Sequence, residues 1–392
     1  MANLRAISRR SLKKTLARCF ILFDRCKELI ASKNMPIDLN DIKRILIVEM
    51  QGFGDTLAVL PTAKALKEKF PEAKLTLITQ KVAKDLFKNS HIFDEIIPLG
   101  ISKTKLGVTD FIRSISKLRQ VEYDLLIIPS WSLRHTAVSL IIRSKAKLGY
   151  LHDYSLRLTY HNDFPVEARN IVTKKEAKYF KEEHIIIRAL KTLEPLGIQN
   201  EEVRYQIEVF PKERIYVSEL LQRRFGLNEG QDFIIISPGA VWKERAWSLK
   251  NWKKLIEMLS ARNNLKFIII GSAEERETYS LLCDGLRSIN LCGQLNLSQL
   301  AALIEKCFAF IGVDSGPMHL AAALNKPVVA LFGPNIPEVS GPKGDLNFVV
   351  QKEMQCRPCN QDYCPVPKGK RCMDLISPED VLRAYNHLMT KL

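Results

Sequence analysis

Residues 44–67 read RILIVEMQGFGDTLAVLPTAKALK and contain the pattern from which the class of fold follows. Residues 44–48 form a short, mostly apolar and β-branched run, which predicts a buried strand. Residues 49–55 supply a turn with two glycines, and residues 56–70 place apolar side chains at helical spacing before Pro71 ends the helix. A continuous apolar strand followed by a helix is typical of a parallel sheet covered on both faces.

The same alternation recurs along the chain on both sides of a weakly patterned stretch. The predicted strands are 75–79, 95–98, 123–128, 233–236, 267–270, 308–313 and 328–331, and the predicted helices are 81–88, 249–261, 273–286, 298–306, 317–324 and about 378–392. The pattern weakens over about 149–205, and Gly197, Asn200 and Pro211 suggest a domain link near 196–211. We therefore expect an α/β protein with an N-terminal arm (1–40) and two doubly wound units (41–205 and 206–392).

The composition is that of a folded protein that is neither secreted nor embedded in a membrane. The chain has 392 residues, of which 46% are hydrophobic and 26% charged, and this length suits two domains. No apolar run approaches the roughly 20 residues of a membrane-spanning helix, and residues 19–23 are too few for a signal-peptide core. Nine cysteines in a chain of this length do not indicate a disulfide scaffold, so we expect a cytoplasmic protein.

The net charge of +16 predicts an anionic partner. Residues 1–40 hold nine Lys or Arg against three acidic residues, and they carry apolar side chains at helical spacing (Leu4, Ile7, Leu12, Leu16, Phe20 and Phe23). One interpretation is an amphipathic helix resting on anionic lipid; the other is a solvated helix packed on the body of the protein. Liposome flotation with and without residues 1–36 distinguishes them.

The first motif is the turn Gly52-Phe53-Gly54-Asp55, which follows a predicted strand and opens a helix. Its glycines permit a tight turn and a close approach of a ligand to the backbone. The dinucleotide fingerprint G-x-G-x-x-G fails, because Leu57 stands at the third glycine position. On this feature alone, Asp55 is better interpreted as a helix cap than as a functional carboxylate.

The second motif, Asp314-Ser315-Gly316-Pro317-Met318-His319, also lies between a strand and a helix. Pro317 suits the first helical turn. The N–H groups of Ser315 and Gly316 would then face outward at a helix N-terminus, which favours a pyrophosphate, and His319 could bind a phosphate or sugar oxygen. The alternative is an ordinary cap with His319 as a packing residue.

The third motif follows another strand end, where Gly239 is succeeded by Lys243, Arg245 and Trp247. Lys243 and Arg245 could neutralise phosphates, although a basic loop is common in so cationic a chain. The sequence has no D-x-D pair of the kind that holds a metal on a sugar-nucleotide diphosphate. Phosphate charge would therefore be met by backbone dipoles and by Lys or Arg, without a metal.

Cysteines gather near the C-terminus as Cys356, Cys359, Cys364 and Cys372. Four thiolates could hold a structural zinc or an iron–sulfur centre. The intervening gaps of two, four and seven residues match neither standard zinc pattern. Two local disulfides or free thiols are equally compatible with the spacing.

Together these motifs resemble glycosyltransferase family 9, the ADP-heptose:lipopolysaccharide heptosyltransferases. The resemblance runs from about 43 to 385 and is sharpest at 44–67 and at 310–342, which reads FIGVDSGPMHLAAALNKPVVALFGPNIPEVSGP. It implies a GT-B fold, in which two Rossmann-like domains face each other across a cleft and the C-terminal domain binds the donor. It also implies inverting, metal-independent transfer from ADP-heptose to a lipopolysaccharide core.

The resemblance also implies roles for individual residues. Asp55 takes the place of the family's proposed general base, with Gly52, Phe53 and Gly54 as the acceptor-side loop. The implied donor-binding residues are Gly239, Lys243, Arg245, Glu275, Asp314, Ser315, Gly316 and His319. Arg245 replaces the family's phosphate-binding lysine, a role that Lys243 could take over, and Ser315 replaces a more usual threonine. Ala240 and Val241 stand where hydroxyl residues often occur.

We therefore expect an enzyme that needs no cofactor and uses an ADP-sugar as its donor. Its partners would be an anionic glycolipid acceptor and the cytoplasmic face of the inner membrane. One alternative is another sugar-nucleotide transferase or an epimerase of the same fold. A nucleic-acid-binding protein would explain the charge, but the sequence lacks the usual recognition motifs, and a catalytically inactive scaffold would leave Asp55 without a use.

Overall fold

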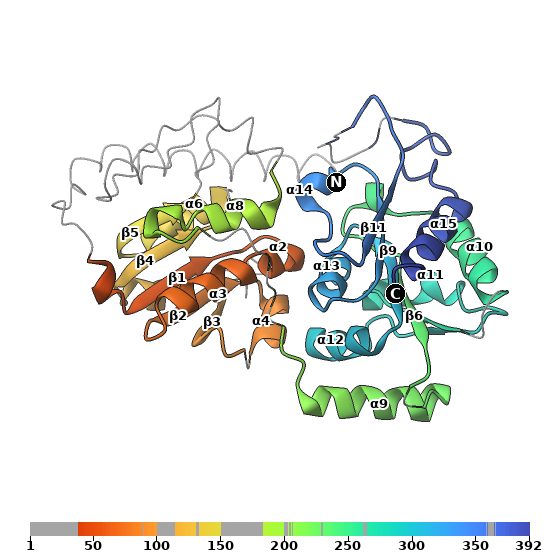
Figure 1. Cartoon of the computed structure of the whole chain (residues 1–392), viewed down its shortest axis with the longest axis horizontal. Coiled ribbons are helices and arrows are strands. Elements are labelled where there is room, and N and C mark those ends of the chain that lie inside the picture. The colour runs from red at the N-terminus through yellow and green to blue at the C-terminus, as the bar shows by residue number, and fades with distance from the viewer. Residues whose placement is uncertain are drawn as a thin grey trace, which may run out of the picture.

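The computed structural model of the chain consists of two α/β lobes, each built on one parallel sheet (Figure 1). The structure describes residues 38–99, 114–149 and 183–392, except residues 89, 131–132, 200–202, 204, 206, 229, 262–264, 358, 360–363 and 365. The expected arm at 1–40 lies outside the described residues up to residue 37. In the described part of the chain, no helix is both long enough and apolar enough to span a bilayer.

The first lobe contains a sheet with the strand order β3-β2-β1-β4-β5. Its strands are β1 (Arg44–Val48), β2 (Lys74–Thr79), β3 (Glu95–Pro98), β4 (Tyr123–Ile128) and β5 (Ser144–Gly149). Its helices are α2 (Phe53–Ala58), α3 (Leu60–Lys69), α4 (Lys81–Phe87), α6 (Leu133–Ile141) and α8 (Ile185–Lys191). The central strand β1 pairs in parallel with both β2 and β4, and its last four residues are buried.

The second lobe contains a sheet with the order β11-β10-β9-β6-β7-β8. Its strands are β6 (Phe233–Ser237), β7 (Lys266–Ile269), β8 (Ser288–Asn290), β9 (Ala309–Val313), β10 (Val328–Phe332) and β11 (Asn347–Gln351). Its helices are α9 (Pro211–Phe225), α10 (Leu249–Ser260), α11 (Arg276–Ser280), α12 (Leu297–Lys306), α13 (Gly316–Ala323), α14 (Pro337–Ser340) and α15 (Pro378–Met389).

Both sheets reverse their strand order at one point, and the functional motifs lie at these two points. The order reverses between β1 and β4 in the first lobe and between β6 and β9 in the second. Ligands of open α/β sheets bind outside the carboxyl ends of strands at such a switch point. The Gly52 turn follows β1, Gly239 follows β6, and Asp314 follows β9. The α/β class with two Rossmann-like units is therefore confirmed.

Several predicted element boundaries were wrong. The helix predicted at 56–70 begins earlier and is divided into α2 and α3 at Val59. The helix predicted at 273–286 shortens to a 3-10 turn (Ala273–Glu275) followed by α11. Strands β5, β8 and β11 were not predicted, and helix α9 begins at Pro211, where we had expected the link between domains to end.

The two lobes touch through helices on their facing sides. Helix α2 packs against α13, and α4 packs against α12 (Figure 1). Two hydrogen bonds also cross between the lobes: the Ser298 hydroxyl donates to the Asp85 carbonyl over 2.7 Å, and His184 Nε2 lies 2.9 Å from the Gly341 carbonyl. These contacts bring the ends of both sheets into one site.

Candidate active site

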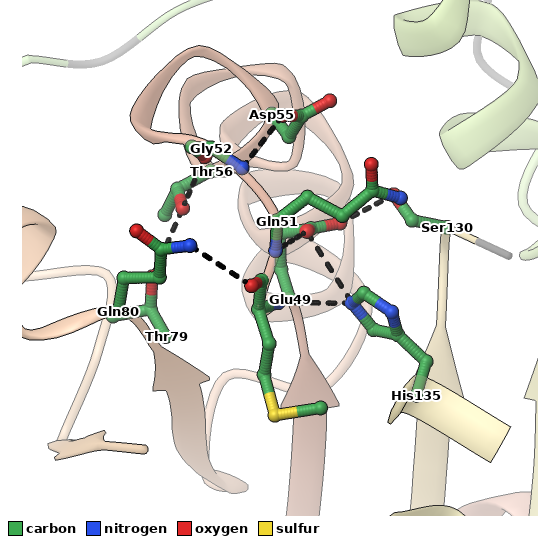
Figure 2. A network of polar contacts seen from close by, with 10 residues as sticks. Glu49, Gln51, Gly52, Asp55, Thr56, Thr79, Gln80, Ser130 and His135 are labelled. Carbon is green, nitrogen blue, oxygen red and sulfur yellow. Dashed lines mark hydrogen bonds and ion pairs between the residues drawn. The ribbon is translucent and has the colours of Figure 1, made fainter. Parts of the chain in front are cut away.

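The Gly52 turn holds Asp55 in the first turn of α2 (Figure 2). Gly52 is the N-cap residue, and the Asp55 carboxylate accepts the Gly52 N–H over 2.8 Å, as in a capping box. The expected cap is therefore present, but the helix begins at Phe53, so Asp55 lies inside it rather than ahead of it. This bond uses one carboxylate oxygen at the switch point of the first sheet.

The environment of Asp55 favours its protonated form. Burial, followed by the negative charge of Glu49, raises the pKa of Asp55 from 3.8 to about 6, against the opposing effect of the Gly52 N–H bond. A carboxylate with a pKa near 6 is ionised at neutral pH and is a stronger base than an ordinary aspartate. This combination suits general-base chemistry.

A buried polar cluster lies beneath this turn, and the sequence analysis missed it. Glu49 is fully buried; its carboxylate accepts the Gln51 N–H over 2.8 Å and a hydrogen bond from the Ser130 hydroxyl. His135, on α6, is also buried and lies with Nε2 3.3 Å from the same carboxylate and 2.9 Å from the Met50 nitrogen. The available signal was a polar residue just after each of two adjacent strands: Glu49 follows β1 directly, and Ser130 is the second residue after β4.

Asp314 is the charged centre of the second motif. It is 3% exposed, and its carboxylate accepts the Asn335 amide over 2.7 Å and lies 3.3 Å from Arg245 Nη1. Asn335 follows β10 and is itself linked through its carbonyl to the Arg357 guanidinium. Asp314 and Arg245 were predicted from the sequence, but Asn335 was not; it joins Asp314 to Arg357 in the loop that follows β11.

Two polar atoms in this region are buried without a hydrogen-bond partner among the described residues: Ser315 Oγ and Arg245 Nε. Buried polar groups are ordinarily paired, so these two atoms mark a place where a ligand oxygen can bind. The Arg245 guanidinium also stacks 5.1 Å from the centre of the Trp242 ring. Lys243 is exposed on the same turn, so the structure brings Arg245, rather than Lys243, to Asp314.

Glu275 lies over the glycines at the ends of β6 and β7. Its carboxylate accepts the Ser272 N–H over 2.8 Å and the Tyr279 hydroxyl over 3.0 Å. A Cβ atom on Gly239 would lie only 2.5 Å from Glu275 Oε1, and one on Gly271 would lie 3.0 Å from Oε2. Gly239 and Glu275, which belong to separate motifs, therefore form one surface, and a side chain at position 239 would displace the Glu275 carboxylate.

The two glycine turns from opposite lobes meet directly. A Cβ atom on Gly54 would lie 2.9 Å from the His319 ring, and one on Gly316 would lie 2.6 Å from the Phe53 ring. Burial lowers the pKa of His319, which keeps its imidazole neutral. The residues chosen on the acceptor side and those at the start of α13 thus belong to one site.

The four clustered cysteines are not joined by disulfide bonds in the structure. Cys356, Cys359, Cys364 and Cys372 are all free thiols. Within the described ranges, which include all four, no group of three or more His, Cys, Asp or Glu residues is arranged to hold a metal ion. The structure therefore shows no disulfide among the four. Cys372 is buried against Gly333, whereas Cys356 is exposed.

Comparisons with known proteins agree with this architecture. The profile of glycosyltransferase family 9 (heptosyltransferase) matches residues 111–369. Lipooligosaccharide heptosyltransferase 2 of Campylobacter jejuni is 27% identical over 343 residues, covering 86% of this chain and 95% of that protein.

Solved structures show the same fold. A family 9 glycosyltransferase from Veillonella parvula has a TM-score of 0.72 at 20% identity and covers 92% of this chain and all of that one. The E. coli heptosyltransferase WaaC, solved with ADP, has a TM-score of 0.64 at 17% identity and covers 88% of this chain and 99% of that one. At these identities the likeness establishes the GT-B fold.

Proposed function

The chain belongs to glycosyltransferase family 9 and is a glycosyltransferase, and we propose that it moves a heptose from ADP-heptose to an anionic glycan of the lipopolysaccharide-core type. The observation that carries the proposal is the meeting of the Asp55 turn with the start of α13, where Ser315 and Arg245 present unpaired buried polar atoms among the described residues. A base and an anion-binding group in one site are what a transfer from a nucleoside diphosphate sugar requires.

The donor diphosphate fits at the N-terminus of α13. Backbone N–H groups there carry a partial positive charge, and Ser315 Oγ and the Arg245 guanidinium can bind phosphate oxygens. Glu275, held over Gly239 and Gly271, is available for the hydroxyl groups of the nucleoside. The related E. coli enzyme solved with ADP supports an adenine nucleotide as the donor. We propose no resident cofactor and no catalytic metal.

The reaction proceeds with inversion at the anomeric carbon. Asp55 takes the proton of the acceptor hydroxyl, and the hydroxyl oxygen attacks the anomeric carbon from the side opposite the phosphate. The bond from the anomeric carbon to the phosphate oxygen breaks, and ADP leaves with the electron pair. The start of α13 and Arg245 stabilise the negative charge that develops on the leaving phosphate.

An acidic acceptor explains the charge of the chain. The net charge of +16 favours a phosphorylated glycolipid and an anionic membrane surface over a neutral substrate. We propose that the enzyme works at the cytoplasmic face of the inner membrane as a peripheral protein. Flotation of the chain with and without residues 1–36 tests the contribution of the basic N-terminal segment.

Substitution Asp55→Asn tests the assignment of the base. The amide retains an oxygen for the Gly52 N–H but cannot take a proton, so turnover with ADP-heptose and a deacylated lipopolysaccharide-core acceptor falls by about 10²–10⁴. The dissociation constant of ADP, measured by titration calorimetry, stays at the wild-type value, because Asp55 lies on the other lobe.

The outcomes distinguish the alternatives. Near-normal turnover of the Asp55→Asn variant would remove Asp55 from the reaction. Screening ADP-heptose, ADP-glucose and UDP- and GDP-sugars by thermal shift and then by turnover identifies the donor class. Conversion of a nucleotide sugar to an isomer without any acceptor would instead indicate an epimerase.

A further inference from the structure

Two carboxylates occupy one turn at the carboxyl end of β1. Glu49 accepts the N–H of Gln51, and Asp55 accepts the N–H of the next residue, Gly52, each over 2.8 Å. Figure 2 shows both bonds on the same loop. The two carboxylates therefore bind adjacent N–H groups of one turn, and the negative charge of Glu49 is, after burial, a cause of the raised pKa of Asp55.

Glu49 has no freedom to leave this position. Its side chain is 0% exposed, its own N–H donates to the Ile78 carbonyl over 2.9 Å, and Ser130 binds the second carboxylate oxygen. His135 closes the cluster from α6 and also receives the Met50 N–H. A buried carboxylate is costly unless it is bonded on several sides. The Gln51 N–H after β1 and the Ser130 hydroxyl after β4 supply those bonds.

We propose that Glu49, held by the Gln51 N–H and the Ser130 hydroxyl, is a positioning residue that shapes the Gly52 turn and keeps Asp55 a strong proton acceptor for the transfer reaction. This inference rests on the proposed role of Asp55 as the base. Glu49 does not touch substrate: it lies beneath the turn and acts through the backbone and through its charge. Its contribution is visible in the raised pKa of Asp55, where burial is the first cause and Glu49 the second.

Other charged groups near α2 do not replace Glu49. His319 on α13 and His184 before α8 both have pKa values lowered by burial, so they are neutral at the pH of the reaction. His135 opposes the effect of Glu49 more weakly. The remaining charged side chains on the helices packed against α2 are at least partly exposed, and solvent screens them (Lys64, Lys67, Glu68, Lys69, Lys81, Lys84, Asp85, Arg188 and Lys191).

The test is the proton affinity of Asp55 in the full chain carrying Glu49→Gln. The glutamine keeps an oxygen for the Gln51 N–H but removes the charge. Carbon-13 labelling of aspartate carboxyls, with the Asp55 signal identified by its loss in Asp55→Asn, gives the titration midpoint directly. We expect a midpoint near pH 6 in the wild type and one lower by on the order of one pH unit in Glu49→Gln.

Turnover provides the second readout. The acidic limb of the kcat profile moves to lower pH by the same amount, and the plateau falls by roughly threefold to tenfold, because Asp55 becomes a weaker base. Glu49→Asp retains the charge and keeps the midpoint close to that of the wild type. Asp124→Asn is a matched control: Asp124 accepts the N–H groups of Lys43 and Arg44 over 2.9 Å at the opposite end of β1, so its loss leaves the Asp55 midpoint unchanged.

If the titration midpoint of Asp55 is the same in Glu49→Gln as in the wild type, the inference is wrong. It is also wrong if Glu49→Asp lowers the midpoint as much as Glu49→Gln does, because that result would indicate a purely structural role for Glu49. These results are separable from failure of the proposed function. If Asp55→Asn remains active, Asp55 is not the base, yet the carbon-13 titration still reports whether Glu49 controls its proton affinity.

Discussion

Ser315 stands at the N-cap of α13, but its side chain does not cap the helix. A serine at this position normally binds an N–H of the first turn, whereas Ser315 Oγ is buried with no partner in the described part of the chain. An unpaired buried hydroxyl costs free energy, and a hydrogen bond to a ligand oxygen would recover it. The position of Ser315 therefore suits ligand binding rather than stabilisation of the helix.

Substitution Ser315→Ala should therefore separate these two properties. The free energy of unfolding does not fall below that of the wild type, because the unpaired hydroxyl makes no stabilising hydrogen bond. The dissociation constant of ADP rises about tenfold through loss of a hydrogen bond to a charged oxygen. Ser377→Ala is the matched control, because Ser377 does cap α15, and its loss costs about 1 kcal/mol without changing ADP binding. Equal ADP affinities for Ser315→Ala and the wild type contradict the prediction.

Site residues that belong to recognisable sequence motifs could be predicted, whereas the residues that form hydrogen bonds around them could not. Asp55, Asp314 and Arg245 were selected and lie in the site. Glu49 and Asn335 are polar residues that follow strands, and that local signal alone does not show that they lie in the site. Their roles depend on partners that are distant in the chain: Asn335 binds a residue 21 positions away, and Glu49 binds one 81 positions away.

At the scale of elements, the contact between α2 and α13 controls the distance between base and donor. Gly316 and Gly54 allow these two helices to approach, since a Cβ atom on Gly316 would lie 2.6 Å from the Phe53 ring and 3.5 Å from the Gly54 nitrogen. Neither glycine has a positive φ, so the backbone conformation does not require glycine at these positions. Glycine is required because a Cβ atom would collide with the opposite helix.

Gly316→Ala should push α2 away from α13. Overpacking of this kind costs about 1–3 kcal/mol of stability, and a displacement of about 1 Å between base and donor lowers kcat on the order of 10²-fold. Ala321→Gly on the same helix is the control: it costs on the order of 1 kcal/mol but adds no atom to the contact, so its kcat stays close to that of the wild type. Thermal unfolding and steady-state kinetics on both variants test the difference, and similar kcat values in the two would refute it.

Whole elements were predictable where their signal was local. Residues 95–98 and 123–128 were predicted as strands with the observed boundaries, because continuous apolar runs flanked by turns have few alternatives. Strand β5 reads SKAKLG and carries two lysines, so its assignment depends on pairing with β4. The stretch before α9 looked like a linker, but Val209 is buried and joins the core.

At the scale of the whole molecule, His184 forms a hydrogen bond between the two lobes. Its Nδ1 accepts the Ile186 N–H at the start of α8, so Nε2 carries the proton and donates to the Gly341 carbonyl of the second lobe. Burial is the main cause that lowers the pKa of His184 from 6.5 to about 4. A second proton on this imidazole would remove the lone pair that caps α8.

This contact makes stability depend on pH with a definite sign. Since the pKa of His184 is lower in the folded chain, its contribution is complete above about pH 6.5 and is lost as the pH falls towards 4, up to on the order of 3 kcal/mol. His184→Asn keeps a capping oxygen but has no imidazole to protonate. The stability advantage of the wild type over this variant therefore shrinks between pH 7.5 and 4.5 in urea unfolding.

Asp55 has the opposite dependence, because its pKa is raised and its contribution falls as the pH rises through 6. Comparing the wild type with His184→Asn cancels this effect, since both contain Asp55. Parallel stability curves for the two chains over this pH range would show that His184 is not the group responsible.

The amino-acid sequence by itself determined the two parallel sheets, the glycine turns at the ends of their strands and the family to which the chain belongs. These follow from periodicity and turn chemistry, which act between residues close together in the chain. Only the tertiary structure decided that Gly54 meets His319, that Arg245 rather than Lys243 reaches Asp314, that Glu49 lies under Asp55 and that the four clustered cysteines remain free. Each of these depends on the distance between side chains whose separation in space the local sequence does not specify.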